Sequence, residues 1–246
     1  MPTTAELALQ LKNDIYEVYE AGKKVGGNFD EAYQQGYQKG YEDASNYNPL
    51  ENATTLANVY KNSVFPENTK LVLNIPNVSS CAAAFNAASG ITHVTLKGGA
   101  PIASAGLNST FINCLDLLYV NIEQLNISTT SLSSTFNGCS NLKEIIGEID
   151  VSTIRSAMTA TFTGCLSLEY VRFKEASIKY AISFADCPSL TKESIDSIIA
   201  GLGTISTAHT LTLNENIVLT EEQLAILNTK TNWTISQVAA SSLEEQ

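Results

Sequence analysis

Cysteine and histidine are the residue types in this chain that could ligate a metal or supply a nucleophile and a base. The chain contains five cysteines and two histidines. Four of the cysteines stand 22 to 26 residues apart, so they form no Cys-x-x-Cys pair of the kind that zinc sites use. His93 and His209 lie far apart, and neither has a carboxylate or a nucleophile beside it. The spacing therefore predicts no metal site.

Motifs of the common enzyme classes are also missing from the sequence. The chain has no G-x-S-x-G, P-loop, H-E-x-x-H or G-x-G-x-x-G segment. A glycosidase would need two carboxylates roughly 5 to 10 Å apart in a cleft, and no such pair stands out. We therefore expect no catalytic residues, no cofactor and no enzymatic activity. A glycan-acting enzyme stays open as an alternative.

The cysteines belong to an internal repeat. A phenylalanine recurs every 22 to 26 residues, four copies carry a cysteine three residues later, and an apolar residue follows three after that. Self-similarity at this period is typical of leucine-rich-repeat-like solenoids, in which each coil buries its apolar side against the next. The cysteines are then expected to be free, buried thiols. The predicted repeat core is Phe85, Phe111, Cys114, Phe136, Cys139, Phe162, Cys165, Phe184 and Cys187.

A strand is predicted after each repeated apolar residue. Apolar and polar residues alternate there, as in Val94-Thr95-Leu96, and alternation at period 2 indicates a half-buried strand. Residues 144–147 alternate less regularly, and residues 70–75 predict a first strand. One strand per coil would build a parallel sheet along one side. The outward positions form a candidate binding face: His93, Thr95, Tyr119, Asn121, Glu144, Tyr170 and Arg172. A solvated sheet face with ordinary cross-strand pairs is the alternative.

The pattern Phe-x-x-Cys-x-x-Leu followed by a short strand resembles the BspA-type leucine-rich repeat of bacterial surface proteins. The resemblance covers about residues 70–190 and implies a solenoid that binds a partner. The flanking segments VYEAGKK, DEAYQQGY and CPSLTKESIDSII are similar to repeat proteins encoded in prophages and gut bacteria of the Firmicutes type. That similarity implies a phage structural, tail-fibre-like protein that recognises a protein or a cell-surface glycan. The repeat alone implies a surface adhesin instead.

Charge and hydropathy limit the partners and the compartment. The formal net charge of −11 disfavours nucleic acid as a partner, because binding to phosphates needs a basic surface. No segment approaches the ~18 apolar residues of a membrane helix, so we expect no membrane insertion. Residues 1–14 show no secretory signal, which predicts a cytoplasmic protein or one released within a particle. A native start farther upstream would make it extracellular.

The N-terminal segment predicts helices. Residues 4–25 carry an apolar heptad seam, and Tyr33, Tyr37 and Tyr41 share one side of a second helical stretch. The seam predicts either a stalk for homo-oligomerisation or a helix packed on the end of the solenoid. A linker around Pro49 places the domain boundary there.

The pattern changes again after the last repeat. Thr191 is placed to cap a helix, residues 209–213 alternate as a strand, Thr220 opens a second helix through a capping box, and residues 233–235 predict a last strand. The predicted fold class is therefore an α/β repeat: a leucine-rich-repeat-like solenoid with parallel strands, an N-terminal helix and an α/β C-terminal cap. Its predicted segments are 1–48 (helical), 49–190 (solenoid), 191–238 (cap) and 239–246 (frayed tail).

Overall fold

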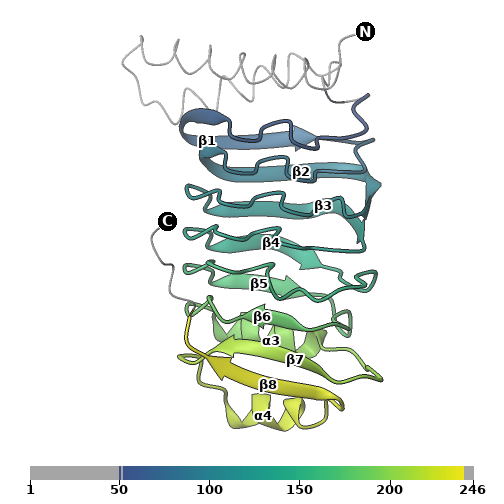
Figure 1. Ribbon diagram of the computed structural model, residues 1–246, viewed down its shortest axis with the longest axis vertical. Coiled ribbons are helices and arrows are strands. Elements are labelled where there is room, and N and C mark those ends of the chain that lie inside the picture. Colours follow the sequence, from purple (N-terminus) through teal and green to yellow (C-terminus); the bar gives the residue numbers. More distant parts are fainter. Residues whose placement is uncertain (1–49, 51, 241–246) are drawn as a thin grey trace.

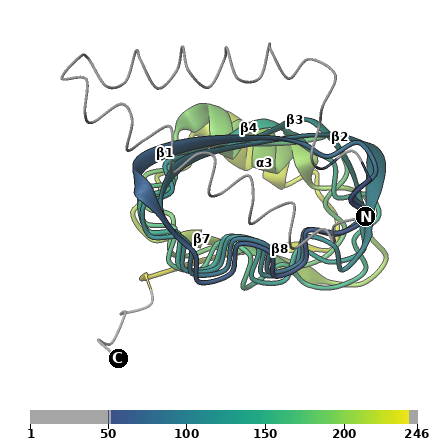
Figure 2. The ribbon, with the colours of Figure 1, turned by 90° about the horizontal axis from the view of Figure 1, so that it is seen from above.

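The protein is a stack of coils along one axis (Figure 1). The computed structural model describes residue 50 and residues 52–240. Seen along the stack, the coils enclose a continuous apolar core between two walls (Figure 2). One wall is a five-stranded sheet, and the opposite wall consists of tight turns that give way to a three-stranded sheet. The chain is therefore a parallel-strand solenoid, consistent with the predicted repeat.

The five-stranded sheet takes one strand from each successive coil, and all its strands are parallel. The inward residues of the predicted alternation, such as Val94, Val120 and Val171, are buried. The first strand starts at Val64, before the predicted start at Lys70. The strands are β1 (Val64–Asn74), β2 (Ser89–Ser104), β3 (Tyr119–Thr129), β4 (Glu144–Ile149) and β5 (Tyr170–Phe173).

The irregular copy in β4 keeps its alternation but bulges. Ile145, Gly147 and Ile149 are buried, so Gly147 stands where other strands place a large apolar side chain. Its φ is +110°, and a Cβ there would lie 2.9 Å from the backbone nitrogen of Glu123. Only glycine fits this approach, and the pairing with β5 shifts register between Glu144 and Glu148.

The repeat phenylalanines form a continuous stack in the opposite wall. Neighbouring rings of Phe85, Phe111, Phe136, Phe162 and Phe184 have centroids 4.9 to 5.8 Å apart and interplanar angles of 4 to 19°. All five are buried, as the repeat predicted. Burial of such a side chain contributes roughly 1.5–3 kcal/mol. The stack therefore supplies much of the attraction between coils.

Tyr60 extends the stack by one coil that the sequence did not predict. Its ring lies 5.1 Å from that of Phe85 at an interplanar angle of 16°. Backbone hydrogen bonds from Tyr60 and Asn62 to the next coil have the same pattern as in later coils. The copy went undetected because tyrosine replaces phenylalanine and Ser63 replaces cysteine.

The repeat cysteines link each coil to the preceding one. The Cys139 thiol donates to the carbonyl oxygen of Phe111 at 2.9 Å, and the thiols of Cys114, Cys165 and Cys187 make the equivalent contact. All five cysteines are free and buried, as predicted. Threonines just before the aromatic residues act similarly, since the Thr135 hydroxyl donates to backbone carbonyls. These buried polar groups are therefore satisfied by the stack itself.

The predicted helices and strands follow the last repeat. Helix α3 (Lys192–Gly201) has Thr191 as its N-cap, and helix α4 (Glu221–Leu227) starts with a complete capping box at Thr220. Strands β6 (Ile182–Phe184), β7 (His209–Asn214) and β8 (Trp233–Val238) form the three-stranded parallel sheet. Figure 2 shows α3 on the side of β1–β4, with β7 and β8 across the core.

Helix α3 covers the edge of β5 with two serines. The Val171 N–H donates to Ser194 Oγ at 3.0 Å, and Ser194 Oγ donates to the Glu169 carbonyl at 2.9 Å. The Phe173 N–H donates to Ser197 Oγ at 2.9 Å. Parallel pairing would otherwise end in unpaired backbone groups, which invite aggregation. The helix therefore supplies hydrogen-bond partners for backbone groups at the edge of β5.

Some predictions concern residues outside the described range. They are the heptad helix at 4–25, the tyrosines at 33, 37 and 41, and most of the tail at 239–246. The boundary near Pro49 also falls there and stays a prediction.

Candidate functional site

The candidate face forms regular columns on the outer side of the five-stranded sheet. His93 pairs in register with Tyr119, Tyr119 with Glu144, and Glu144 with Tyr170. Lys70, which the sequence analysis did not include, pairs with His93 and extends this column by one strand. We call these five residues the first column. Adjacent strands lie about 4.8 Å apart, so neighbouring side chains of the column are within contact distance.

Two of the three aromatic members of the first column contact each other. The rings of His93 and Tyr119 are stacked, with centroids 4.8 Å apart, and His93 Nδ1 lies 2.9 Å from the Thr92 hydroxyl. Partial burial and the nearby positive charge of Lys70 lower the pKa of His93 below its ordinary value. A neutral imidazole stacked on a phenol offers a flat, weakly polar surface. Tyr170, at 43% exposure, is the most accessible aromatic member.

The other three residues of the candidate face lie beside the first column and not in one line. Thr95 pairs with Asn121, whose side-chain oxygen accepts a hydrogen bond from the Glu123 N–H. Arg172 pairs with Glu148 because the β4 bulge shifts the register. The sheet therefore brings His93, Tyr119, Glu144 and Tyr170 together, and displaces Arg172 along the strand.

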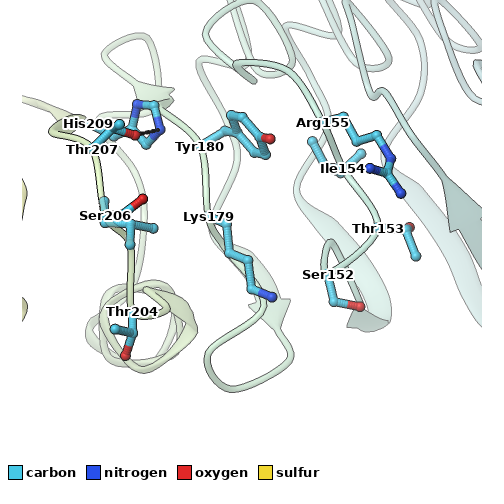
Figure 3. Close-up of a pocket in the computed structure, with 11 residues that line it drawn as sticks. Ser152, Thr153, Ile154, Arg155, Lys179, Tyr180, Thr204, Ser206, Thr207 and His209 are labelled. Carbon is cyan, nitrogen blue, oxygen red and sulfur yellow. Dashed lines mark hydrogen bonds between the residues drawn. The ribbon is translucent and has the colours of Figure 1, made fainter.

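A second candidate site is a groove on the side of the stack, where the chain crosses from the sheet wall to the opposite wall (Figure 3). It is lined by segments of three consecutive coils: 152–155, 179–180 and 204–209. We call it the side groove. Its volume is about 340 Å³, and Figure 3 shows Tyr180 between His209 and Arg155. Hydroxyl-bearing and basic side chains dominate its lining.

Reasoning from the sequence missed the side groove. Its lining includes single cations, Arg155 and Lys179, in segments without a repeat signature. The lining segments come together through the register between coils. Ile182 pairs with Leu211, and this pairing places Tyr180 beside His209. That register could be read only by extending the repeat beyond its last phenylalanine.

Neither candidate site shows a metal-binding cluster or an activated nucleophile. Within the described residues, no group of three or more His, Cys, Asp or Glu side chains could hold a metal ion. Burial raises the pKa of every cysteine thiol, which disfavours the reactive thiolate. In the same part of the chain, no helix has the length and hydropathy of a membrane span.

Comparison with known proteins identifies the repeat. A family model described as the BspA type leucine rich repeat region matches the chain in six copies, over residues 61–191 and 108–223. The matched ranges together include more than half of the chain, start just after Tyr60 and contain α3. No curated protein and no solved structure matches it.

Proposed function

The chain belongs to the BspA-type leucine-rich repeat family, and from this membership we propose that it binds a protein partner through the outer face of its five-stranded sheet. The observation that carries the proposal is the first column, where His93 and Tyr119 stack and Tyr170 stands exposed in the same register. Solenoids present extended binding surfaces, and tyrosine is enriched at interfaces. The face is held by a sheet, so little ordering opposes binding.

The charges of the face favour a partner with both signs of charge. Lys70 lies at one end of the first column, and Glu144 lies between Tyr119 and Tyr170. Opposite charges at a fixed spacing determine how the partner is aligned on the face more than they increase its affinity. The tyrosines are therefore expected to supply most of the binding free energy, and the charges the specificity.

A cell-binding assay tests the proposed face. We infer that the partner lies on a bacterial surface, so fluorescently labelled protein should bind to bacterial cells, and protease treatment of the cells should remove the binding. Changing Tyr119, Tyr170 and Arg172 together to alanine should reduce binding by at least about tenfold, because truncation of central aromatic residues costs roughly 2 kcal/mol or more.

Matched variants away from the face decide the outcome. Lys61→Ala, Leu115→Ala and Glu175→Ala remove exposed side chains outside the five-stranded sheet and should leave binding unchanged. Equal binding by the face variant and the parent protein would reject the proposed face. Binding that survives protease but is lost after digestion of wall polysaccharide would identify a glycan partner instead.

We propose that the protein serves as a tail-fibre-like component of a phage or prophage virion. This proposal rests on the heptad seam at residues 4–25, whose narrow apolar stripe suits a homo-oligomeric stalk. Light scattering of the intact chain and of a version without residues 1–48 tests it. An oligomer that becomes a monomer on truncation supports the stalk, whereas monomers in both cases would reject it.

Two alternatives have their own tests. A BspA-type surface adhesin would be exported, so antibody labelling of intact producing cells should detect it, and detection only after lysis would reject it. A glycan-acting enzyme would release soluble fragments from wall polysaccharides, so sustained turnover in that assay would replace the binding proposal.

A further inference from the structure

The side groove is basic although the chain is acidic. The chain has 14 Lys and Arg residues against 25 Asp and Glu residues, yet Arg155 and Lys179 line the groove and no carboxylate does. Among the described residues, the side-chain ion pairs are formed by Lys174 and Lys192, so no carboxylate of this part of the chain forms an ion pair with either groove cation. Two cations in a concave site attract anions more strongly than the same charges on a flat surface.

Two aromatic rings, those of Tyr180 and His209, line the same groove, and the ring of Trp233 lies beside it. The ring of Tyr180 lies 5.5 Å from that of His209, and His209 lies 6.1 Å from Trp233. The Trp233 indole N–H donates to the Gly203 carbonyl at 2.9 Å, which fixes the ring at the surface. All three rings are half-buried, so each presents part of its apolar surface. Such surfaces can lie against the C–H face of a sugar ring.

Hydroxyl groups complete the lining. Thr204 and Ser206 make no side-chain hydrogen bond to any other described residue, so their hydroxyls are available to a ligand, whereas the Ser152 hydroxyl is bound to the Asp150 carboxylate. A hydroxyl both donates and accepts, which matches the hydroxyls of a saccharide. Figure 3 shows Lys179 on the middle segment of the groove, between the segments that carry Ser206 and Ser152. The volume of about 340 Å³ lies within the range of small-ligand pockets.

We propose that the side groove binds an acidic saccharide, a sugar that carries a carboxylate or a phosphate group. Arg155 and Lys179 contact the anionic group, the hydroxyls contact the sugar hydroxyls, and Tyr180 and His209 pack against the ring. The site is separate from the first column and does not depend on the function proposed for it. Its three segments come from consecutive coils, so it exists only in the assembled stack.

Two matched pairs of sugars test the proposal. Cellobiouronic acid and cellobiose differ by one carboxylate, and glucose 6-phosphate and glucose differ by one phosphate. Trp233 is the only tryptophan and its ring neighbours that of His209, so its indole N–H signal in a nitrogen-15 NMR titration reports on changes next to the groove. We expect at least one acidic sugar to shift this signal and to bind about tenfold more tightly than its neutral partner, as for a charge-assisted contact.

Variants with the same change in net charge separate the groove from general electrostatics. Arg155→Gln with Lys179→Gln should abolish the preference for the acidic sugar, whereas Lys61→Gln with Lys143→Gln should leave affinity within about twofold. Tyr119→Ala with Tyr170→Ala should also leave it unchanged, so failure of the sheet-face proposal remains distinguishable. Unchanged urea midpoints would confirm that the groove variant folds.

Four results would overturn the proposal. They are equal binding of acidic and neutral sugars, equal loss of affinity in the charge-matched control, inorganic phosphate binding as tightly as glucose 6-phosphate, and no titration by either acidic sugar up to about 10 mM. The third result would reduce the groove to a simple anion site.

Discussion

At the residue scale, the buried cysteines combine a packing role with a hydrogen bond. Burial raises the pKa of the Cys81 and Cys114 thiols to about 12, and it also raises the pKa of Cys139, Cys165 and Cys187. Only the thiolate reacts, so the folded protein should not react with Ellman's reagent at pH 8, and five thiols should react after unfolding. Rapid reaction of any thiol in the folded protein would contradict this.

The same pKa shifts give the thiols a pH-dependent effect on stability. The unfolded chain loses its thiol protons near the ordinary pKa of 9, whereas the folded chain keeps them to higher pH. The stabilisation is therefore complete below about pH 9 and is lost as the pH rises toward the raised values. Urea unfolding at pH 7 and pH 10 measures this decrease, which a variant with all five cysteines replaced by alanine should not show to the same extent.

Left-handed turn residues flank the aromatic stack. Asn113, Gly138 and Gly164, each two residues after a phenylalanine, have positive φ, and Ala87 holds the equivalent position at +54°. A Cβ disfavours this conformation by roughly 1–2 kcal/mol. Ala87→Gly should therefore stabilise the protein by about 1 kcal/mol, measured by urea unfolding, because the exposed methyl group contributes little packing.

Ala185→Gly is the matched control for that change. Ala185 follows Phe184 in the last repeat and does not have positive φ. Glycine there gives no relief of strain and adds freedom to the unfolded chain, so it should destabilise by about 0.5–1 kcal/mol. Stability changes of the same sign at Ala87 and Ala185 would show that backbone strain is not the reason why glycine is favoured at the positive-φ position.

At the element scale, α3 protects the sheet edge through hydroxyl groups. Ser194→Ala should leave the buried Val171 N–H without its acceptor, whereas the Glu169 carbonyl keeps the Thr191 N–H as a donor. An unsatisfied buried donor costs about 1–3 kcal/mol, so urea unfolding should show a loss of that size. Hydrogen exchange of the Val171 amide should also accelerate.

A serine at the surface serves as the reference for α3. Ser189 donates to the Leu166 carbonyl at an exposed position, where water can replace the hydroxyl. Ser189→Ala should therefore change stability by less than about 0.5 kcal/mol. A cost at Ser194 as small as that at Ser189 would mean that α3 does not satisfy the edge of β5.

Individual elements show where sequence reasoning succeeded. Caps at Thr191 and Thr220 and the alternation in β2, β3 and β5 are local signals, and the structure contains each of them. The bulge at Gly147 was not predicted, because it depends on the approach of the Glu123 backbone from the adjacent strand. The outward residues could be predicted by alternation, but the displacement of Arg172 could not.

At the scale of the whole molecule, the solenoid could be predicted because one period carries its core. Tyr60 escaped detection because tyrosine and Ser63 replace the repeat phenylalanine and the repeat cysteine of its coil, although its ring stacks like the others. The side groove depends on register among coils after the repeat changes, where Tyr180 and His209 meet without a shared motif. Contacts that depend on the register between coils, and not on a repeated residue type, produce no periodic pattern in the sequence.

The aromatic stack also predicts how cooperatively the solenoid unfolds. Phe136 lies between Phe111 and Phe162, so Phe136→Ala opens a cavity that weakens two coil interfaces and should cost about 3–5 kcal/mol. Coils contact only their neighbours, so the two halves should then unfold separately. The fluorescence of Trp233 reports on the C-terminal half, and far-ultraviolet circular dichroism reports on both.

The two probes should give one urea transition in the parent protein and two separated transitions in Phe136→Ala. Leu115→Ala, which truncates an exposed side chain, should keep a single transition at nearly the parent midpoint. A cost below about 1 kcal/mol at Phe136 would contradict the stacked core itself. Coincident transitions at the full cost would instead show that the sheet and the backbone-directed cysteine hydrogen bonds couple the coils without the aromatic stack.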